Sequence, residues 1–153
     1  MKTVKKRKGK IRVWIVILSI VGVIGIGMAA AVAFTAPGRN ELQNMVIANV
    51  DFKKLRDGIY TGAYHGSKES FRDAAVEVTV ASGAVTKIKV TEGVLAGDKQ
   101  TNEIRKGLSI NNLLDNVIKS QSLQVDVISG ATLTSNAHLK AVENALKQAG
   151  GLP

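Results

Sequence analysis

The stretch Asp126-Val127-Ile128-Ser129-Gly130-Ala131-Thr132-Leu133-Thr134-Ser135 lies near the end of a chain of 153 residues and leads into a helical pattern. Gly130 lets the backbone bend and lets another group approach it closely. The hydroxyl of Thr134 or Ser135 is suited to cap the helix that follows. Backbone amides at such a helix start point outward, and the helix dipole adds partial positive charge. We therefore expect a phosphate-binding turn here, with Thr132 supplying a further hydroxyl.

The residues before this stretch predict an antiparallel sheet. Residues 73–81 alternate between apolar and polar side chains, and residues 85–92 return as a second strand after a tight turn at Ser82-Gly83. Residues 59–65 are expected to form the first strand, in which Gly62 marks a bulge or a point of close approach. One-sided alternation of this kind is typical of strands that have one face against a core and one in solvent.

After the predicted strands, apolar residues recur at helical spacing. One helix is expected from about Lys99 to Gly107, and a second from about Asn111. The final helix is expected to begin at Thr134 or Ser135 and to end near Gln148, with Glu143 and Lys147 as a surface ion pair and His138 as a partly buried, hydrogen-bonded residue. The predicted fold class is α+β: an antiparallel sheet with packed helices, preceded by a single N-terminal transmembrane helix.

The N-terminal third differs in composition from the rest of the chain. Residues 1–12 are a basic tail. Residues 13–34 contain no charged side chain, and this segment is long enough for a helix that crosses a bilayer. The basic flank predicts a cytoplasmic tail and an extracytoplasmic domain; the alternative is a cleaved signal peptide. Thr35 to Gly38 should break the helix, residues 35–54 form a linker or stalk, and residues 55–150 form the folded domain.

Charge and composition exclude several classes of function. The formal net charge of +9 comes from residues before position 40, and the remainder is close to neutral, so the excess charge is no sign of nucleic-acid binding. The absence of cysteine excludes disulfides, thiolate metal sites and thiol catalysis. Two histidines do not make a metal site, and no nucleophile–base triad or nucleotide-binding glycine loop is present, so no catalytic residue is predicted.

The stretch from Asp126 to Ser135 resembles the flavinylation motif of FMN-binding domains. Residues 55–62, 76–90 and 121–126 are similar to other parts of the same domains. This family occurs in the C and G subunits of sodium-pumping and related ion-translocating oxidoreductases, and in small membrane-anchored flavoproteins of extracellular electron transfer. The resemblance implies that Thr132 is joined to the phosphate of FMN through a phosphoester. It also implies a partner, a separate flavin transferase that uses FAD as donor and a magnesium ion.

The resemblance also assigns roles to the neighbours of Thr132. Ser129, Gly130 and Ala131 would shape the loop and offer amides to the phosphate. Asp126 would hold the loop or help to place the metal ion of the transferase. Two further groups carry open alternatives: Leu133, Thr134 and Ser135 either touch the flavin or cap the helix, and Tyr60, Tyr64 and Phe71 either form a shelf for the flavin ring or belong to the core of the sheet.

The implied function is that of a membrane-anchored, extracytoplasmic flavoprotein that acts as an electron-transfer carrier between a membrane donor and an extracellular acceptor. The flavin performs the redox chemistry, while the protein supplies position and electrostatics. The main alternative is an exported partner-binding or sensing module that holds no flavin. A flavin reductase with its own substrate is a third interpretation, disfavoured because no nicotinamide site or proton-relay cluster is visible.

Overall fold

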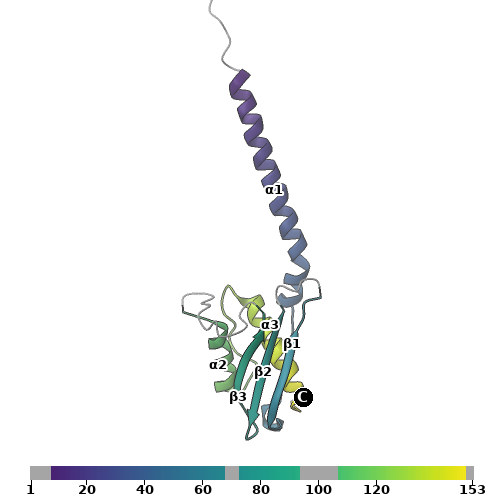
Figure 1. The fold of residues 1–153 in the computed structure, drawn as a ribbon, viewed down its shortest axis with the longest axis vertical. Coiled ribbons are helices and arrows are strands. Elements are labelled where there is room, and N and C mark those ends of the chain that lie inside the picture. Colours follow the sequence, from purple (N-terminus) through teal and green to yellow (C-terminus); the bar gives the residue numbers. More distant parts are fainter. Residues whose placement is uncertain (1–7, 68–72, 94–106, 151–153) are drawn as a thin grey trace, which may run out of the picture. The chain divides into compact units, whose positions relative to one another are not determined.

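The structure, a computed structural model, describes residues 8–67, 73–93 and 107–150. It divides into two units, residues 1–37 and residues 38–153. The second unit has an α+β fold, as predicted, and Figure 1 labels its elements. The described elements are α1 (Lys8–Gln43), η1 (Phe52–Lys54), β1 (Gly58–Tyr64), β2 (Ala74–Ala81), β3 (Ala84–Glu92), α2 (Ile110–Ser120) and α3 (Thr132–Gln148). The helix expected from Lys99 lies outside the described residues, whereas the one expected from Asn111 is α2.

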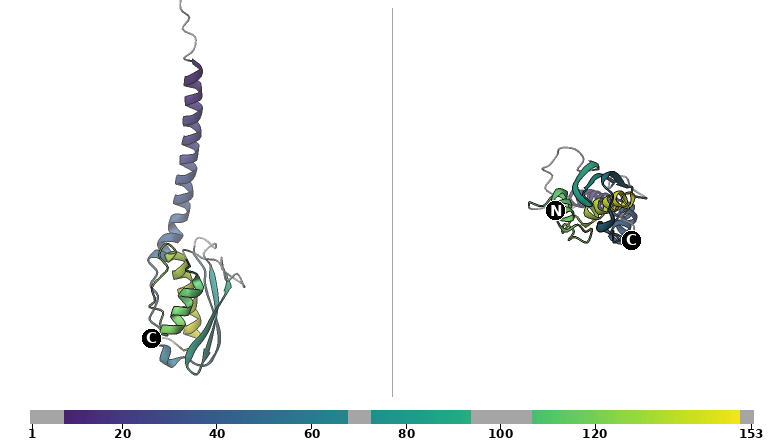
Figure 2. Two further views of the ribbon diagram at one scale, coloured as in Figure 1. Left: turned by 90° about the vertical axis from the view of Figure 1, so that its left-hand side faces the viewer. Right: turned by 90° about the horizontal axis from the view of Figure 1, so that it is seen from below.

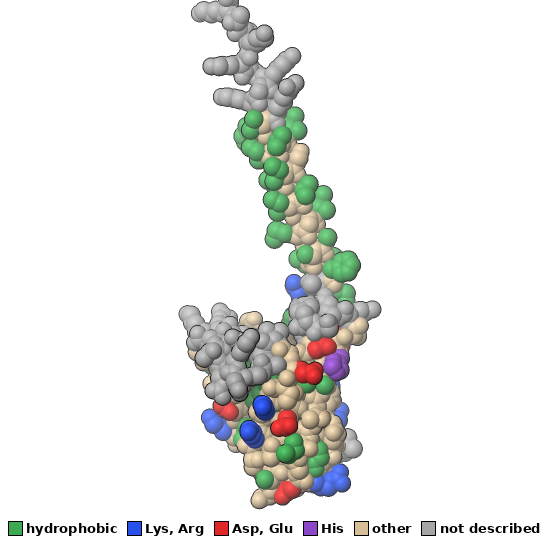
Figure 3. Space-filling view, in the orientation of Figure 1, with side chains coloured by type: hydrophobic (Ala, Val, Ile, Leu, Met, Phe, Trp, Pro, Cys, Tyr) green, Lys and Arg blue, Asp and Glu red, His purple; other side chains and the backbone are tan. Residues whose placement is uncertain are grey.

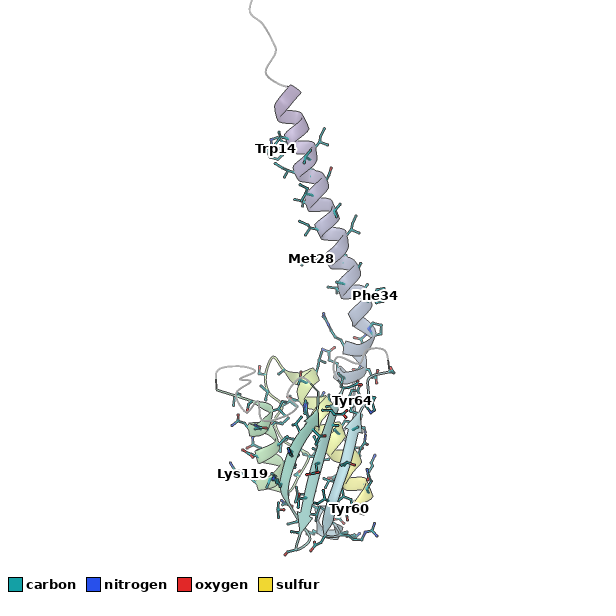
Figure 4. All side chains as sticks on the ribbon, in the orientation of Figure 1. Trp14, Met28, Phe34, Tyr60, Tyr64 and Lys119 are labelled. Atoms are coloured by element: carbon teal, nitrogen blue, oxygen red, sulfur yellow. The ribbon has the colours of Figure 1, made fainter. Side chains whose placement is uncertain are left out.

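Most of α1 is apolar. The segment Val13–Phe34 has 22 residues and a mean hydropathy of 2.7, and none of it is buried within the protein. Figure 4 shows Trp14, Met28 and Phe34 along this helix. A helix of this length and composition could cross a bilayer.

The predicted helix break at Thr35 to Gly38 is wrong, because α1 continues through Pro37 to Gln43. A proline removes one backbone donor from a helix, but tertiary contacts hold the turn that follows it. Leu42 is 1% exposed, and the carboxylate of Glu41 accepts a hydrogen bond of 3.0 Å from the hydroxyl of Tyr64. Local sequence preference is therefore overridden by packing.

The described strands form a three-stranded antiparallel sheet in the order β1-β2-β3. Helices α2 and α3 lie side by side on one face, as the left view of Figure 2 shows, and buried valines of β2 point toward them. The other face carries charged side chains of both signs among hydrophobic and uncharged polar ones (Figure 3). Ser82 and Gly83 have φ angles of 55° and 73°, as a type I′ hairpin turn requires. The predicted alternation and hairpin are confirmed.

Helix α3 packs on β1 without an intervening side chain at Gly62. A Cβ atom at Gly62 would collide with the carbonyl oxygen of Ala141 and with the amide nitrogen of Ala145. The side-chain amides of Asn144 and Gln148 donate to the carbonyl oxygens of Ala63 and Thr61, at 2.9 and 2.7 Å. The close approach expected at Gly62 is therefore present, and α3 also covers the outer edge of β1.

The predicted ion pair of Glu143 with Lys147 is present, but its placement on the surface is wrong because Glu143 is buried. Its carboxylate accepts hydrogen bonds from Lys140 at 2.8 Å and from the N–H of Ala48 at 3.0 Å, and Lys147 lies 2.6 Å away. Burial alone would raise the pKa of Glu143, but the three donors together outweigh burial and lower it. This carboxylate ties the segment after α1, which also buries Val50, to the middle of α3.

His138 is buried at 2% exposure. Its Nδ1 lies 2.8 Å from the carbonyl oxygen of Thr134, so Nδ1 carries the proton of the neutral ring. Its Nε2 has no hydrogen-bond partner among the described residues. The expectation of a partly buried, fully hydrogen-bonded histidine is therefore only half right. Burial lowers the pKa of His138 and outweighs the opposing effect of the Thr134 carbonyl.

Replacing Gly62 with Ala should destabilise the domain by about 1–3 kcal/mol, at the upper end of that range, because the clashing atoms belong to the backbone of α3. Chemical denaturation measures the change. The matched control is Gly83→Ala, where a Cβ meets nothing closer than 4.0 Å and only the positive φ opposes the substitution. A smaller loss at Gly62 than at Gly83 would contradict direct helix-on-strand packing.

His138 should make the domain less stable in acid. Because its pKa is lowered in the folded state, the unfolded chain binds a proton first as the pH falls below about 6.5, and the stability contribution of the neutral ring is lost from there downward. The free energy of unfolding of the wild type minus that of His138→Leu should therefore decrease as the pH is lowered from about 7 to about 5. A difference that stays constant over this range would contradict a lowered pKa of His138 in the folded state.

Candidate functional site

A tight turn precedes α3. The N–H of Ala131 donates to the carbonyl oxygen of Ile128 at 2.8 Å, which closes a turn over Ser129 and Gly130. Gly130 occupies the third position with a φ of 83°. This φ is the value that a type II turn needs at that position, and only glycine adopts it without strain. Gly130 is therefore required by the turn itself.

Helix α3 begins at Thr132, so the predicted start at Thr134 or Ser135 is wrong. The N-cap residue is Ala131, and it supplies no side-chain hydrogen bond. The N–H of Ser135 donates to the carbonyl oxygen of Ala131 at 2.9 Å, which is the first bond of helical spacing. The glycine turn, and not a capping hydroxyl, therefore starts the helix.

The first turn of α3 has backbone donors that are unpaired among the described residues. The N–H groups of Thr132, Leu133 and Thr134 have no acceptor among the residues that the structure describes. No acidic side chain lies in this turn, and the side chain of Thr132 is exposed. Open amides, the positive end of the helix dipole and an accessible hydroxyl together suit a phosphate ester.

Three neighbouring side chains face inward to different degrees. Leu133 is half-buried and packs against the core, and Thr134 is also half-buried. Ser135 is completely buried, and its Oγ accepts a hydrogen bond from the N–H of Ile128 at 3.3 Å. The hydroxyl of Ser135 thus faces the turn from inside the protein and does not cap α3.

Asp126 precedes the turn that leads into α3. Its carboxylate is exposed and accepts no hydrogen bond from the described residues, so no bond of this kind holds the loop. It lines a shallow hollow of about 490 Å³ between the end of α2 and the segment before the turn. The lining residues are Asn116, Lys119, Ser120, Gln124, Val125 and Asp126.

The aromatic candidates for a flavin shelf separate in space. Tyr60 and Tyr64 lie at opposite ends of β1 (Figure 4). The Tyr60 hydroxyl donates to the carbonyl oxygen of Arg56 at 3.0 Å, near the C-terminal end of α3, where the N–H of Arg56 bonds to Ala149. Tyr64 is buried and bonded to Glu41. Phe71 lies outside the described residues.

Sequence reasoning missed the inward role of Ser135 and the contact of Asn136. The side-chain amide of Asn136 donates to the carbonyl oxygen of Leu42 at 2.8 Å. The burial of Ser135 has a sequence signal, since it precedes Leu139 and Val142 at helical spacing on one stripe. The contact of Asn136 with a residue 94 positions away has none.

Comparison with known proteins identifies the family of this domain. Residues 72–147 match the family model of the FMN-binding domain. Over 123 residues, or 80% of this chain, the sequence is 32% identical to the NADH:acrylate oxidoreductase of Vibrio harveyi. The chain spans only 11% of the length of that protein. The chain therefore belongs to the FMN-binding domain family, and FMN is its cofactor.

Proposed function

We propose that FMN is attached covalently to Thr132 through a phosphoester, and that the domain serves as an electron carrier on the outer side of the membrane. One observation carries the proposal. Within the region that matches the FMN-binding family, an exposed threonine hydroxyl stands at the first position of a helix whose first amides have no acceptor among the described residues.

The residues around Thr132 fit the phosphate of FMN. A phosphate ester on Thr132 is negatively charged, and the N–H groups of Leu133 and Thr134 with the helix dipole stabilise such a charge. Gly130 keeps the approach free of a side chain, and Ser129 and Ala131 complete the turn. The absence of acidic groups in the first turn avoids repulsion.

Attachment requires a second protein. A threonine hydroxyl is unreactive unless a base or metal activates it, and both imidazoles are engaged elsewhere, His138 with Thr134 and His65 with Asp73. A flavin transferase with FAD and a magnesium ion meets this need. The transfer forms a bond from Thr132 Oγ to the phosphorus of the FMN half of FAD and breaks the pyrophosphate bond. AMP leaves, and the hydroxyl proton passes to a base of the transferase.

Asp126 is suited to assist that transfer from outside the loop. Its carboxylate is exposed, and magnesium prefers carboxylate oxygen ligands. It lies six positions before Thr132 and borders an open hollow. We assign it to the placement of the metal ion of the transferase, in preference to holding the loop.

Helix α1 supports the proposed location. Val13–Phe34 can span a membrane by length and composition, and the basic residues before it favour a cytoplasmic N-terminus. The domain is then extracytoplasmic, where a covalent link keeps the flavin from diffusing away. When bound, FMN accepts and donates one or two electrons, so the domain can link a membrane donor to an external acceptor.

The oxidoreductase activity named for the Vibrio harveyi protein belongs to that protein. Since this chain covers 11% of it, the shared part is one domain, and we assign electron transfer without a substrate of its own. A partner-binding or sensing module without flavin, and a flavin reductase, are both less well supported. A module without flavin does not account for the match to the FMN-binding family. A flavin reductase would need a nicotinamide site, and none is seen among the described residues.

Thr132→Ala should abolish covalent flavin. In membranes that contain an active transferase, the intact mass of the wild-type chain should include one FMN, and its fluorescence should survive denaturation. The variant should show neither. Its free energy of unfolding should change by no more than about 0.5 kcal/mol, because the side chain is exposed and caps nothing.

Two further variants make the test specific to one hydroxyl. Thr132→Ser keeps the alcohol and should keep the adduct. Thr134→Ala removes a hydroxyl from the same turn and should also keep it. An adduct on Thr132→Ala, or a wild-type chain without adduct beside an active transferase, would overturn the proposal.

A further inference from the structure

Three hydrogen bonds close a ring around the turn before Thr132. The N–H of Ala131 bonds to the carbonyl of Ile128 at 2.8 Å, and the N–H of Ser135 bonds to the carbonyl of Ala131 at 2.9 Å. The N–H of Ile128 bonds to the Oγ of Ser135 at 3.3 Å. The first two are bonds that a turn and a helix form by themselves. The third depends on one side chain.

The hydroxyl of Ser135 therefore connects the turn to the helix by a side-chain hydrogen bond. Ser135 is 0% exposed, so no solvent can replace its oxygen as the acceptor for Ile128. Ile128 is itself buried at 5% exposure, which places its side chain in the core. Without the hydroxyl, the N–H of Ile128 loses its partner inside the protein, and the turn is joined to α3 only through Ala131.

The ring encloses the attachment point. Thr132 lies between Ala131 and Ser135, so both ends of its backbone segment are members of the ring. The side chain of Thr132 is exposed, whereas that of Ser135 faces the interior. The hydroxyls of Thr132 and Ser135 consequently have different surroundings: that of Thr132 is accessible to an external enzyme, and that of Ser135 is not.

We propose that Ser135 is a positioning residue for flavin transfer, acting through Ile128 and the turn to fix the direction of the Thr132 hydroxyl. The inference rests on the proposed function and assigns Ser135 no contact with the flavin. Because Ser135 does not reach the surface that a transferase touches, its loss should lower kcat of the transfer and leave KM for the chain nearly unchanged. An ester already formed should persist.

The test uses the full chain in detergent with purified flavin transferase, FAD and magnesium ion. Ser135→Ala should reduce kcat by roughly tenfold to a hundredfold, the range expected when a reacting group is displaced by about 1 Å. Ser135→Thr retains the hydroxyl oxygen and should recover most of the rate. A rise in KM with unchanged kcat, or a Ser135→Ala rate equal to the wild type, would overturn the proposal.

General destabilisation is excluded by a matched variant. Val142→Ala truncates another fully buried side chain of α3, farther from the turn, and should leave kcat near the wild-type value at a temperature where both variants are folded. A loss of kcat in Val142→Ala as large as that in Ser135→Ala would overturn the proposal.

Amide hydrogen exchange on the chain before flavin attachment gives a readout that needs no transferase. In Ser135→Ala, protection should fall at Ile128 and Ala131 and persist at Leu146. Unchanged protection at Ile128 would overturn the positioning role. This result is distinct from failure of the proposed function, in which the wild type itself gains no flavin while its Ile128 amide remains protected.

Discussion

The contact between Gly62 and the backbone of α3 is the constraint on which the arrangement of the domain depends. Because no side chain separates β1 from Ala141 and Ala145, the helix lies directly on the strand, and small residues on both partners permit this distance. The amides of Asn144 and Gln148 then fix its position along the edge of β1. With the axis of α3 set in this way, its first turn has one possible place, at the end of the sheet where Tyr64 lies (Figure 4).

Electrostatics along α3 favours an anion at that end. Glu143 is the acidic residue of this helix, and a buried carboxylate without partners would repel a phosphate. Lys140 and Lys147 both contact it, and the N–H of Ala48 adds a third donor. The charge of Glu143 is therefore balanced locally, three turns from Thr132. The open amides of the first turn are left with no acidic neighbour on the helix.

The sequence was sufficient for features that depend on local pattern and not for those set by distant packing. The alternation of apolar and polar side chains predicts β2 and β3, and the residues Ser82-Gly83 predict the hairpin turn between them. The start of α3 differs from the prediction because Ser and Thr are the usual capping residues, whereas here the turn at Gly130 precedes a helix that begins at Thr132. The burial of Glu143 and the continuation of α1 past Pro37 depend on Ala48, Leu42 and Tyr64, whose proximity no local pattern reveals.

The first turn of α3 serves three purposes because successive residues on a helix point in different directions. Thr132 faces solvent, Ser135 faces the turn through Ile128, and Asn136 holds the carbonyl of Leu42. The exposed hydroxyl of Thr132 thus lies in the same stretch of helix that binds the end of α1 through Asn136. The proposed attachment site and the contact with the end of α1 therefore lie within five consecutive positions of one helix, residues 132–136.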